Sequence, residues 1–525
     1  MAFGFVERIF PSWQNVLLAI LAAVLLILAF PDFEYWLLAW FALVPLMLAV
    51  EREKASVVRS FFTGWIFGTA FFFGTCWWLT YAPIHYAGFP PWLAYSGMVF
   101  VGFAVGVFPA IFAAILSVLL RRFGSWAFLA APFVWVFTEF LRYWLTGNNW
   151  NAVGYSQAFV YIIVGFASLG GSSLVGFLVT MANSMILIGF RKCQPRFPFV
   201  ILIVMCLFII GFWRPGDPDQ DFGKWQVKSD ARVIFVQPNV PMSGLDHAKS
   251  DELRQRQIEM AEAAIREDNS FWPTNSQLPT LVILPESPMN FMYNDDREFQ
   301  QFIGDFAKRN NVSVLFNSAE PDATSGKYFN SAVMVGPDGK EAVQYDKIFL
   351  LPFGEAVPPL LEGIVPGFVG NFSYGREYDI LPIGDAKAGV MICFESHFGQ
   401  LSRRYVRDGA DVIIEMTNDG YLGPTPVLRQ HLANAVFRAI ETNRPVLRVT
   451  NVGITAYVNE RGQVLDPTAG YTEDTRVWSV SKSDGQQTFY VRYGDGFAWL
   501  CSAVTMALLI FSFRRRGNEN SANSA

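Results

Sequence analysis

The stretch Ala388-Gly-Val-Met-Ile-Cys-Phe-Glu395 places a cysteine directly after an apolar run that is typical of a buried β-strand. Similar runs recur along the same half of the chain, and segments with helical periodicity lie between them. We predict strands at 232–236, 280–284, 312–316, 388–392, 411–415 and 446–450, and helices at 251–267, 297–309 and 427–442. This alternation indicates an α/β domain.

Several of the predicted strands end in a polar residue. Because chemistry in α/β sheets gathers at strand ends, these residues are the first candidates for a functional site. They are Gln237, Glu286, Asn317, Cys393, Asn418 and Asn451.

Charge is distributed unevenly over the 525 residues, of which 52% are hydrophobic and 16% charged. Residues 1–214 hold only 17 charged side chains, whereas the remaining 311 residues hold 68. An apolar first part and a water-soluble second part therefore share one polypeptide. The net charge of −5 comes without a basic patch, so we expect no nucleic-acid partner.

The apolar part is long enough to cross a bilayer several times, since one helix needs about 20 largely apolar residues. We predict eight spans, at 13–30, 35–50, 61–81, 92–120, 126–145, 158–190, 197–213 and 497–513. The sixth contains Gly170-Gly171, which indicates a broken or interfacial piece. The expected domains are a seven-span membrane bundle at 1–214, a catalytic domain at 225–485, a final span at 494–516 and a disordered tail at 517–525.

If the chain crosses the membrane eight times, the basic residues that flank the spans all lie on one side of the membrane. The loops of the other side, 31–34, 82–91 and 146–157, contain no Lys or Arg. We therefore expect both termini in the cytoplasm and the soluble part outside it. We expect no cleavable signal, because the first apolar stretch is followed at once by a second, with no small-residue cleavage site between them. The basic residues are Arg8, Arg52, Lys54, Arg59, Arg121, Arg122, Arg191, Lys192, Arg196, Arg514, Arg515 and Arg516.

Cys393 is the single cysteine of the soluble part, which therefore has no internal disulfide. It is either a small core residue or a nucleophile. A nucleophilic thiol needs a base or a cation nearby. His397 and His431 could serve in a papain-like scheme, while Glu286 at a strand end and Lys347 beside apolar residues form a second possible set. No spacing typical of metal ligands is present.

Three blocks carry a resemblance to a known family: Pro-Glu286-Ser, Lys347 followed by Leu-Pro-Phe-Gly-Glu355, and Gly-x-x-Ile-Cys393-Phe-Glu395. In this order they resemble the nitrilase, or carbon–nitrogen hydrolase, superfamily, which implies an αββα sandwich. Together with the spans on both sides, the whole chain resembles the apolipoprotein N-acyltransferase family. It departs from that pattern at Phe349, at Tyr421-Leu422, and in lacking a Trp after Val240.

The resemblance implies transfer of a fatty acyl group from a phospholipid to the α-amino group of a diacylglyceryl-cysteine, the last step of lipoprotein maturation. It implies a ping-pong mechanism with Cys393 as nucleophile, Glu286 as general base and Lys347 as oxyanion stabiliser. Glu355, Glu395 and a backbone N–H near Phe394 would support them, with no metal and no cofactor. We further expect phosphatidylethanolamine as donor, a multi-pass protein of the bacterial inner membrane with a periplasmic catalytic domain, and a monomer.

Two other functions stay open at this point. A membrane-anchored amidase would use the same three residues to hydrolyse a C–N bond, but it would need only one anchor. A transporter or receptor would require charges inside the spans, where Glu139 and Arg142 stand one helical turn apart. These two either pair with each other or contact a lipid headgroup.

The apolar, Pro- and Gly-broken stretch 357–372 is either a lid for an acyl chain or a loop packed on its own domain.

Overall fold

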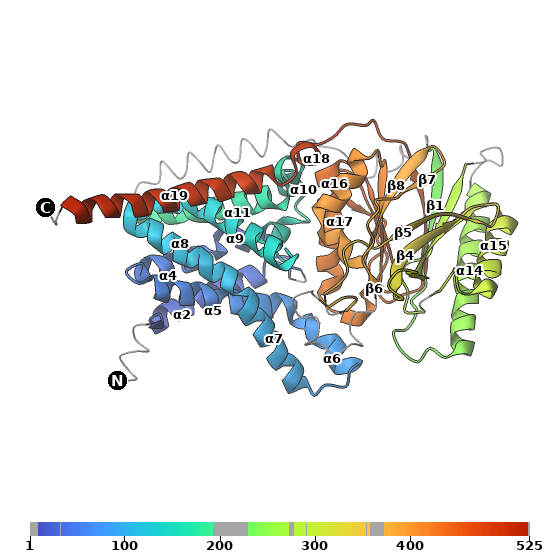
Figure 1. Cartoon of the computed structure of the whole chain (residues 1–525), viewed down its shortest axis with the longest axis horizontal. Coiled ribbons are helices and arrows are strands. Elements are labelled where there is room, and N and C mark those ends of the chain that lie inside the picture. The colour runs from blue at the N-terminus through green and yellow to red at the C-terminus, as the bar shows by residue number, and fades with distance from the viewer. Residues whose placement is uncertain are drawn as a thin grey trace. The chain divides into compact units, whose positions relative to one another are not determined.

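The computed structural model describes residues 9–31, 33–192, 229–271, 278–289, 291–352, 354–357 and 372–522. The chain divides into two compact units, coloured along the sequence in Figure 1. The first, called unit 1, comprises Met1–Arg214, Thr425–Ala433 and Tyr493–Ala525. Unit 2 comprises Pro215–Pro424 and Asn434–Arg492.

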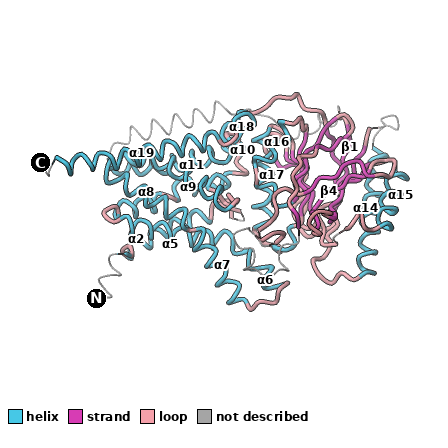
Figure 2. Tube along the Cα trace, viewed as in Figure 1, coloured by secondary structure: helices cyan, strands magenta, loops and turns pink. Residues whose placement is uncertain are grey.

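Unit 1 is helical in its described part (Figure 2), and its helices begin and end where the sequence favours it. Prolines stand in the first turn of α4, α7 and α9, and Gly147 ends α9 in the left-handed conformation. The elements are α2 (Trp13–Ile27), η1 (Trp36–Leu38), α3 (Ala39–Ala42), α4 (Val44–Glu53), α5 (Val57–Cys76), η2 (Trp77–Thr80), α6 (Tyr81–His85), α7 (Pro91–Val105), α8 (Val107–Phe123), η3 (Gly124–Ala130), α9 (Ala131–Thr146), η4 (Val153–Gln157), α10 (Tyr161–Val164), α11 (Ala167–Lys192) and α19 (Gly496–Ala522).

Four helical stretches in the described residues are long and apolar enough to cross a membrane, and Trp13–Ile27 is a shorter apolar helix. They are Val57–His85, Pro91–Thr146, Ala167–Arg191 and Gly496–Arg514. Pro91–Thr146 contains α7, α8, η3 and α9 in succession. The membrane character that the sequence predicts is thus confirmed, while the count of eight spans stays a prediction. The span predicted at 197–213 lies outside the described residues.

Glycines let the helices of unit 1 approach closely. A Cβ added to Gly68 of α5 would lie 2.8 Å from the Cα atom of Gly106, and one on Gly102 of α7 would lie 3.0 Å from the Thr69 carbonyl oxygen. Such contacts between small residues drive helix association in bilayers, where burial from water contributes little. In α11 the backbone departs from helical geometry at Gly170 and Gly171, which confirms the predicted break.

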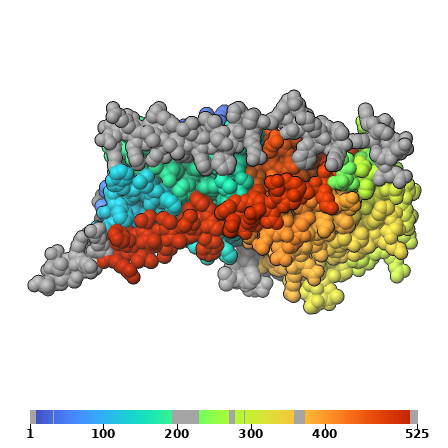
Figure 3. Space-filling model, turned by 90° about the horizontal axis from the view of Figure 1, so that it is seen from above, coloured from blue at the N-terminus to red at the C-terminus, as the bar shows by residue number. Residues whose placement is uncertain are grey.

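The C-terminal helix α19 belongs to unit 1 and packs along α8, α9 and α11, as its red surface beside the cyan helices shows (Figure 3). Phe511 stacks on Phe123 of α8, and Trp499 makes an edge contact with Phe140 of α9. The helix continues to Ala522, into the segment 517–525 for which we expect a tail.

Unit 2 contains two mixed β-sheets with helices on their outer sides, the predicted αββα arrangement (Figure 1). One sheet has the order β13-β1-β2-β3-β4-β5, with β6 paired to β4, and the other has the order β12-β11-β10-β9-β8-β7. The strands are β1 (Ala231–Gln237), β2 (Thr280–Ile283), β3 (Ser313–Pro321), β4 (Tyr328–Val335), β5 (Glu341–Asp346), β6 (Phe372–Ser373), β7 (Ile380–Ile383), β8 (Ala386–Ile392), β9 (Val412–Thr417), β10 (Val446–Thr450), β11 (Ala456–Val458), β12 (Val464–Leu465) and β13 (Asp474–Val480). The helical elements are α14 (His247–Phe271), α15 (Arg297–Asn310), η6 (Cys393–His397), α16 (Gly399–Arg407), η7 (Asp419–Leu422), the C-terminal part of α17 (Val427–Thr442) and α18 (Phe489–Tyr493).

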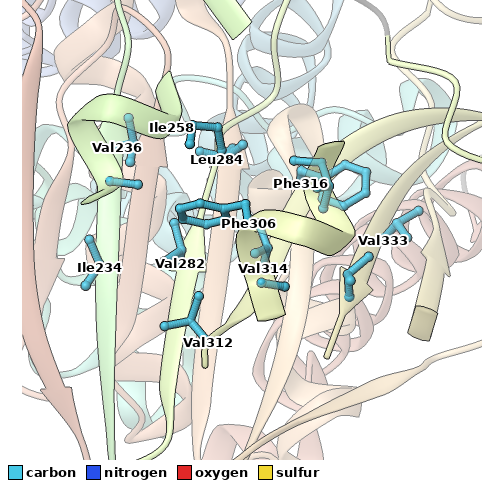
Figure 4. Close-up of a cluster of buried hydrophobic side chains, with 14 of the residues drawn as sticks. Ile234, Val236, Ile258, Val282, Leu284, Phe306, Val312, Val314, Phe316 and Val333 are labelled. Atoms are coloured by element: carbon cyan, nitrogen blue, oxygen red, sulfur yellow. The ribbon is translucent and has the colours of Figure 1, made fainter. Parts of the chain in front are cut away.

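All six strands and three helices predicted in this part are present, with ends shifted by a few residues. The apolar faces of α14 and α15 pack on the first sheet, where Phe306 lies among Val282, Val314 and Ile258 (Figure 4). On the second sheet, a Cβ on Gly389 of β8 would lie 2.3 Å from the ring of Tyr405, so α16 approaches this strand closely.

We predict that Phe306→Ala lowers the free energy of unfolding of unit 2 by about 3–5 kcal/mol, because it removes a fully buried ring and leaves a cavity. Urea-dependent proteolysis of the purified full-length protein measures this change. Gln301→Ala, on the exposed side of the same helix, is the control and should change it by less than about 0.5 kcal/mol. Equal midpoints for the two variants would contradict the packing described here.

Candidate active site

Cys393 stands at the end of β8, at the first residue of the short helix η6. Its backbone has φ +54°, a left-handed conformation that is unusual for a residue with a side chain. Such strain persists only where the surroundings enforce it, and it is frequent at functional sites. Cys393 is in no disulfide, and the residue is partly exposed.

The buried carboxylate of Glu395 enforces this geometry. Its Oε2 atom accepts the backbone N–H of Ile392 at 2.9 Å, one residue before the cysteine. Its Oε1 atom accepts the N–H groups of Ile348 and Phe349, at 2.8 and 3.0 Å, directly after Lys347. The hydroxyl of Tyr345 donates to the same carboxylate. Glu395 thereby ties the chain beside Lys347 to the chain beside Cys393.

Lys347 lies just after β5 and is almost fully buried, with 1% of its side chain exposed. Its Nζ atom lies 2.8 Å from both carboxylate oxygens of Glu355. The second oxygen of Glu355 also accepts the backbone N–H of Leu351 at 2.7 Å. An ammonium group in this position is paired and oriented, as a buried charge requires.

Glu286 follows β2 and is held from two sides. Its Oε1 atom accepts a hydrogen bond from the Asn330 side chain at 3.2 Å, and its Oε2 atom accepts the backbone N–H of Asn418 at 3.1 Å. The Cys393 thiol also hydrogen-bonds the carboxylate. The structure therefore brings together all three residues that the sequence singles out, from three separate strand ends.

The electrostatics of the three groups are coupled. Burial raises the pKa of Glu286, and the nearby charge of Lys347 opposes that change. Burial, together with the charge of Glu286, raises the pKa of the Cys393 thiol. For Lys347, burial lowers the pKa, but Glu355 and Glu286 outweigh it, so the net pKa is raised. At neutral pH these shifts keep Cys393 as a thiol and Lys347 as a cation, and they increase the proton affinity of the Glu286 carboxyl group beside the thiol.

Burial also raises the pKa of Glu395 to about 7, although Lys347 and the backbone donors oppose this shift. Phe394 is buried and packs edge-on against Phe398. Among the described residues, no group of three or more His, Cys, Asp or Glu side chains could hold a metal ion.

The two histidines of the alternative scheme lie in different settings. The Nδ1 atom of His397 is 3.0 Å from the Asn434 side chain, and its ring stacks on Phe394. His431 belongs to unit 1, where its ring lies 5.9 Å from Trp150. The contacts of Cys393 favour Glu286 as its base over either histidine.

Asn330 is the site residue that the sequence reasoning missed. Its Nδ2 atom donates to Glu286 and, at 2.6 Å, to Glu355, while its Oδ1 atom accepts from Asn317. The sequence offers only a weak signal for it, the polar pair Asn330-Ser331 within the run Tyr328–Val335. Its contact with Asn317 depends on the pairing of β3 with β4. Asn330 bridges the two carboxylates on either side of Lys347.

The remaining sequence candidates contribute elsewhere. In unit 1, Arg142 donates to the Trp150 carbonyl at 2.8 Å and to Asn149 at 3.1 Å, and Glu139 accepts the Val153 N–H at 2.7 Å. Both side chains therefore hold the segment that follows α9. The proposed lid at 357–372 falls, apart from its ends, outside the described residues.

Two known family models match parts of this chain. Residues 22–185 match the family model described as "Apolipoprotein N-acyltransferase N-terminal domain", and residues 252–489 match the one described as "Carbon-nitrogen hydrolase". The yeast Nit3 protein of Saccharomyces cerevisiae, a member of the nitrilase superfamily, has 18% identity and a TM-score of 0.37 over 48% of this chain and 91% of its own.

Two curated relatives extend over almost the whole chain. The apolipoprotein N-acyltransferase of Geobacter metallireducens is 31% identical and covers 96% of both chains, and that of Thermotoga maritima is 27% identical over 98% of this chain and 97% of its own. Fold and site together define a carbon–nitrogen hydrolase domain joined to a set of apolar helices. At this identity and coverage, the chain belongs to the apolipoprotein N-acyltransferase family.

We predict that activity falls on acidification through a pKa above the ordinary glutamate value of about 4.3. As the general base that the sequence predicts, Glu286 has to be ionised to accept a proton. Burial raises its pKa, so the active form is lost as the pH drops through the raised value. The pH dependence of kcat/KM for acyl transfer in detergent measures this limb. An acid limb at or below about 4.3 would contradict the assignment.

We also predict that Asn330→Ala lowers kcat by roughly 5- to 100-fold, because Glu286 and Glu355 each lose a buried hydrogen bond. Steady-state kinetics of the purified protein test this. Lys340→Ala, at the exposed turn between β4 and β5, is the control. Unchanged kinetics in Asn330→Ala would show that the bridge has no part in catalysis.

Proposed function

We propose that this chain transfers a fatty acyl group from a phospholipid to the α-amino group of the N-terminal diacylglyceryl-cysteine of apolipoproteins. Family membership over nearly the full length makes it an acyltransferase of a bacterial membrane. The observation that carries the proposal is the meeting of Glu286, Lys347 and Cys393 within that family's catalytic domain. The amidase alternative has less support, because the relatives match the apolar helices as well as the catalytic domain.

In the first half-reaction, the Glu286 carboxylate takes the proton of the Cys393 thiol, and the sulfur attacks the ester carbonyl carbon of the phospholipid. The Lys347 ammonium, held by Glu355, stabilises the negative charge that develops on the carbonyl oxygen. The C–O bond then breaks, and the lysophospholipid leaves with the proton held by Glu286. A thioester remains on Cys393.

In the second half-reaction, the amine of the acceptor attacks the thioester carbonyl. Glu286 accepts the proton that the nitrogen loses, the C–S bond breaks, and the sulfur recovers a proton from Glu286. An amide is the product and the enzyme returns to its starting state. Because water would hydrolyse the thioester, the site must exclude it between the two steps.

The proposal has finer parts that rest on the family resemblance and on the pattern of basic residues. They are phosphatidylethanolamine as donor, an inner-membrane location with a periplasmic catalytic domain and cytoplasmic termini, and a monomer. The absence of basic residues from the loops 31–34, 82–91 and 146–157 supports this orientation. This step would be the last in lipoprotein maturation.

We predict that Cys393→Ala lowers N-acylation of a diacylglyceryl-cysteine peptide by at least about a thousandfold in detergent with phosphatidylethanolamine, because it removes the nucleophile. Cys393→Ser should remain far below the unmodified protein, since a hydroxyl is harder to ionise than a thiol. Cys501→Ala, which removes a buried free thiol of unit 1, is the matched control. Normal transfer by Cys393→Ala would refute the proposal, and release of free fatty acid without peptide acylation would favour hydrolysis.

A further inference from the structure

Three buried charged residues, Arg448, Glu415 and Asp419, form a group on and after strands β9 and β10. They have no part in the mechanism above. Arg448 of β10 pairs with Glu415, its neighbour in register on β9, and donates to the Oδ2 atom of Asp419 at 2.8 Å. Arg448 and Glu415 have no exposed surface, and 2% of Asp419 is exposed. In the same sheet Glu415 stands opposite Met391, two residues before Cys393.

Two carboxylates and one guanidinium at these depths are costly. Their attraction for one another does little more than offset the loss of hydration, and apolar residues of similar volume often stabilise a core as well or better. The group carries one excess negative charge close to the nucleophile, and the charge of Arg448 interacts with Cys393. Stability alone therefore does not account for this group of charges.

The link to the site runs through the backbone. Asp419 is the next residue after Asn418, whose N–H donates to Glu286. The Asn418 side chain accepts hydrogen bonds from the Asn451 amide at 3.2 Å and from the Gly420 N–H at 3.1 Å, so this turn is fixed. A Cβ on Gly453 would lie 2.3 Å from Asp419 Oδ2, so glycine leaves just enough room for the carboxylate.

We propose that Arg448 is a positioning residue, which fixes Asp419 and, through the peptide N–H of Asn418, sets the orientation and charge environment of Glu286. Arg448 suits this task because its planar guanidinium can bind two carboxylates at once, whereas a lysine is a point charge. The inference rests on the proposed role of Glu286 as general base.

The charged groups around both residues fix the sign of the expected effect. Lys347, Glu355 and the Cys393 thiol face Glu286, while Glu415 and Asp419 face Arg448. Removing the positive charge of Arg448 disfavours the ionised form of Glu286. Removing the negative charge of Asp419 favours it. The two changes should therefore move the acid limb of activity in opposite directions, which loss of structure alone would not do.

The experiment compares Arg448→Met, Arg448→Lys and Asp419→Asn in the full-length protein, with the pH dependence of kcat and KM for peptide N-acylation as readout. We expect kcat to fall roughly ten- to a hundredfold with KM within about twofold. The acid limb should move up in Arg448→Met and down in Asp419→Asn, each by roughly half a unit to one unit. Arg448→Lys should restore the position of the limb but only part of kcat.

Arg404→Met is the control, because Arg404 of α16 makes a solvent-accessible ion pair with Asp408, the residue that follows the helix. Limbs that move in the same direction, or not at all, would overturn the inference. If Arg448→Met does not fold, Asp419→Asn alone tests the inference. In Asp419→Asn the charge of Arg448 is still neutralised by Glu415. An active Glu286→Gln variant would refute the proposed mechanism itself. If Glu286→Gln is inactive but the acid limbs of Arg448→Met and Asp419→Asn are not shifted, only the role of Arg448 is refuted.

Discussion

The site depends on one buried carboxylate that hydrogen-bonds two distant parts of the backbone. Glu395 accepts N–H groups that follow Lys347, on the first sheet, and one that precedes Cys393, at the end of β8 in the second sheet. Four donors around one carboxylate offset much of the cost of burying it. The same bonds hold Cys393 in its left-handed conformation and set the position of the cation relative to the sulfur.

With the two ends fixed in this way, the acid–base chemistry follows from burial. A carboxylate in water is a weak base, but inside the domain the ionised form of Glu286 loses hydration and its pKa rises. Lys347 lowers the pKa of Glu286 again, and in the proposed mechanism it also stabilises negative charge on a substrate oxygen. Glu355 offsets the effect on Glu286, because it pairs with the ammonium and its own charge raises the pKa of Glu286, whereas the hydrogen bond from Asn330 lowers that pKa. This balance of charges suits the proposed mechanism, in which Glu286 takes up and returns a proton in each half-reaction.

Much of the fold and of the central site could be predicted from sequence, because both rest on local patterns. Apolar runs such as 388–392 and 446–450 recur as β8 and β10, and the three motif blocks mark Glu286, Lys347 and Cys393. Strands β4 and β5 escaped prediction because their residues mix polar and apolar character: Asn330 and Ser331 face partners on neighbouring strands. The ion pairs of Arg448 could not be predicted either. They depend on the pairing of β9 with β10, which no single sequence window reveals.

The most direct test of the central claim is intact-mass spectrometry of the full-length protein after incubation with phosphatidylethanolamine and no acceptor. The account predicts a mass increase of one fatty acyl group, located on Cys393, labile to hydroxylamine and lost when diacylglyceryl-cysteine peptide is added. Acyl transfer to the peptide with no such adduct on Cys393 at any stage would contradict it.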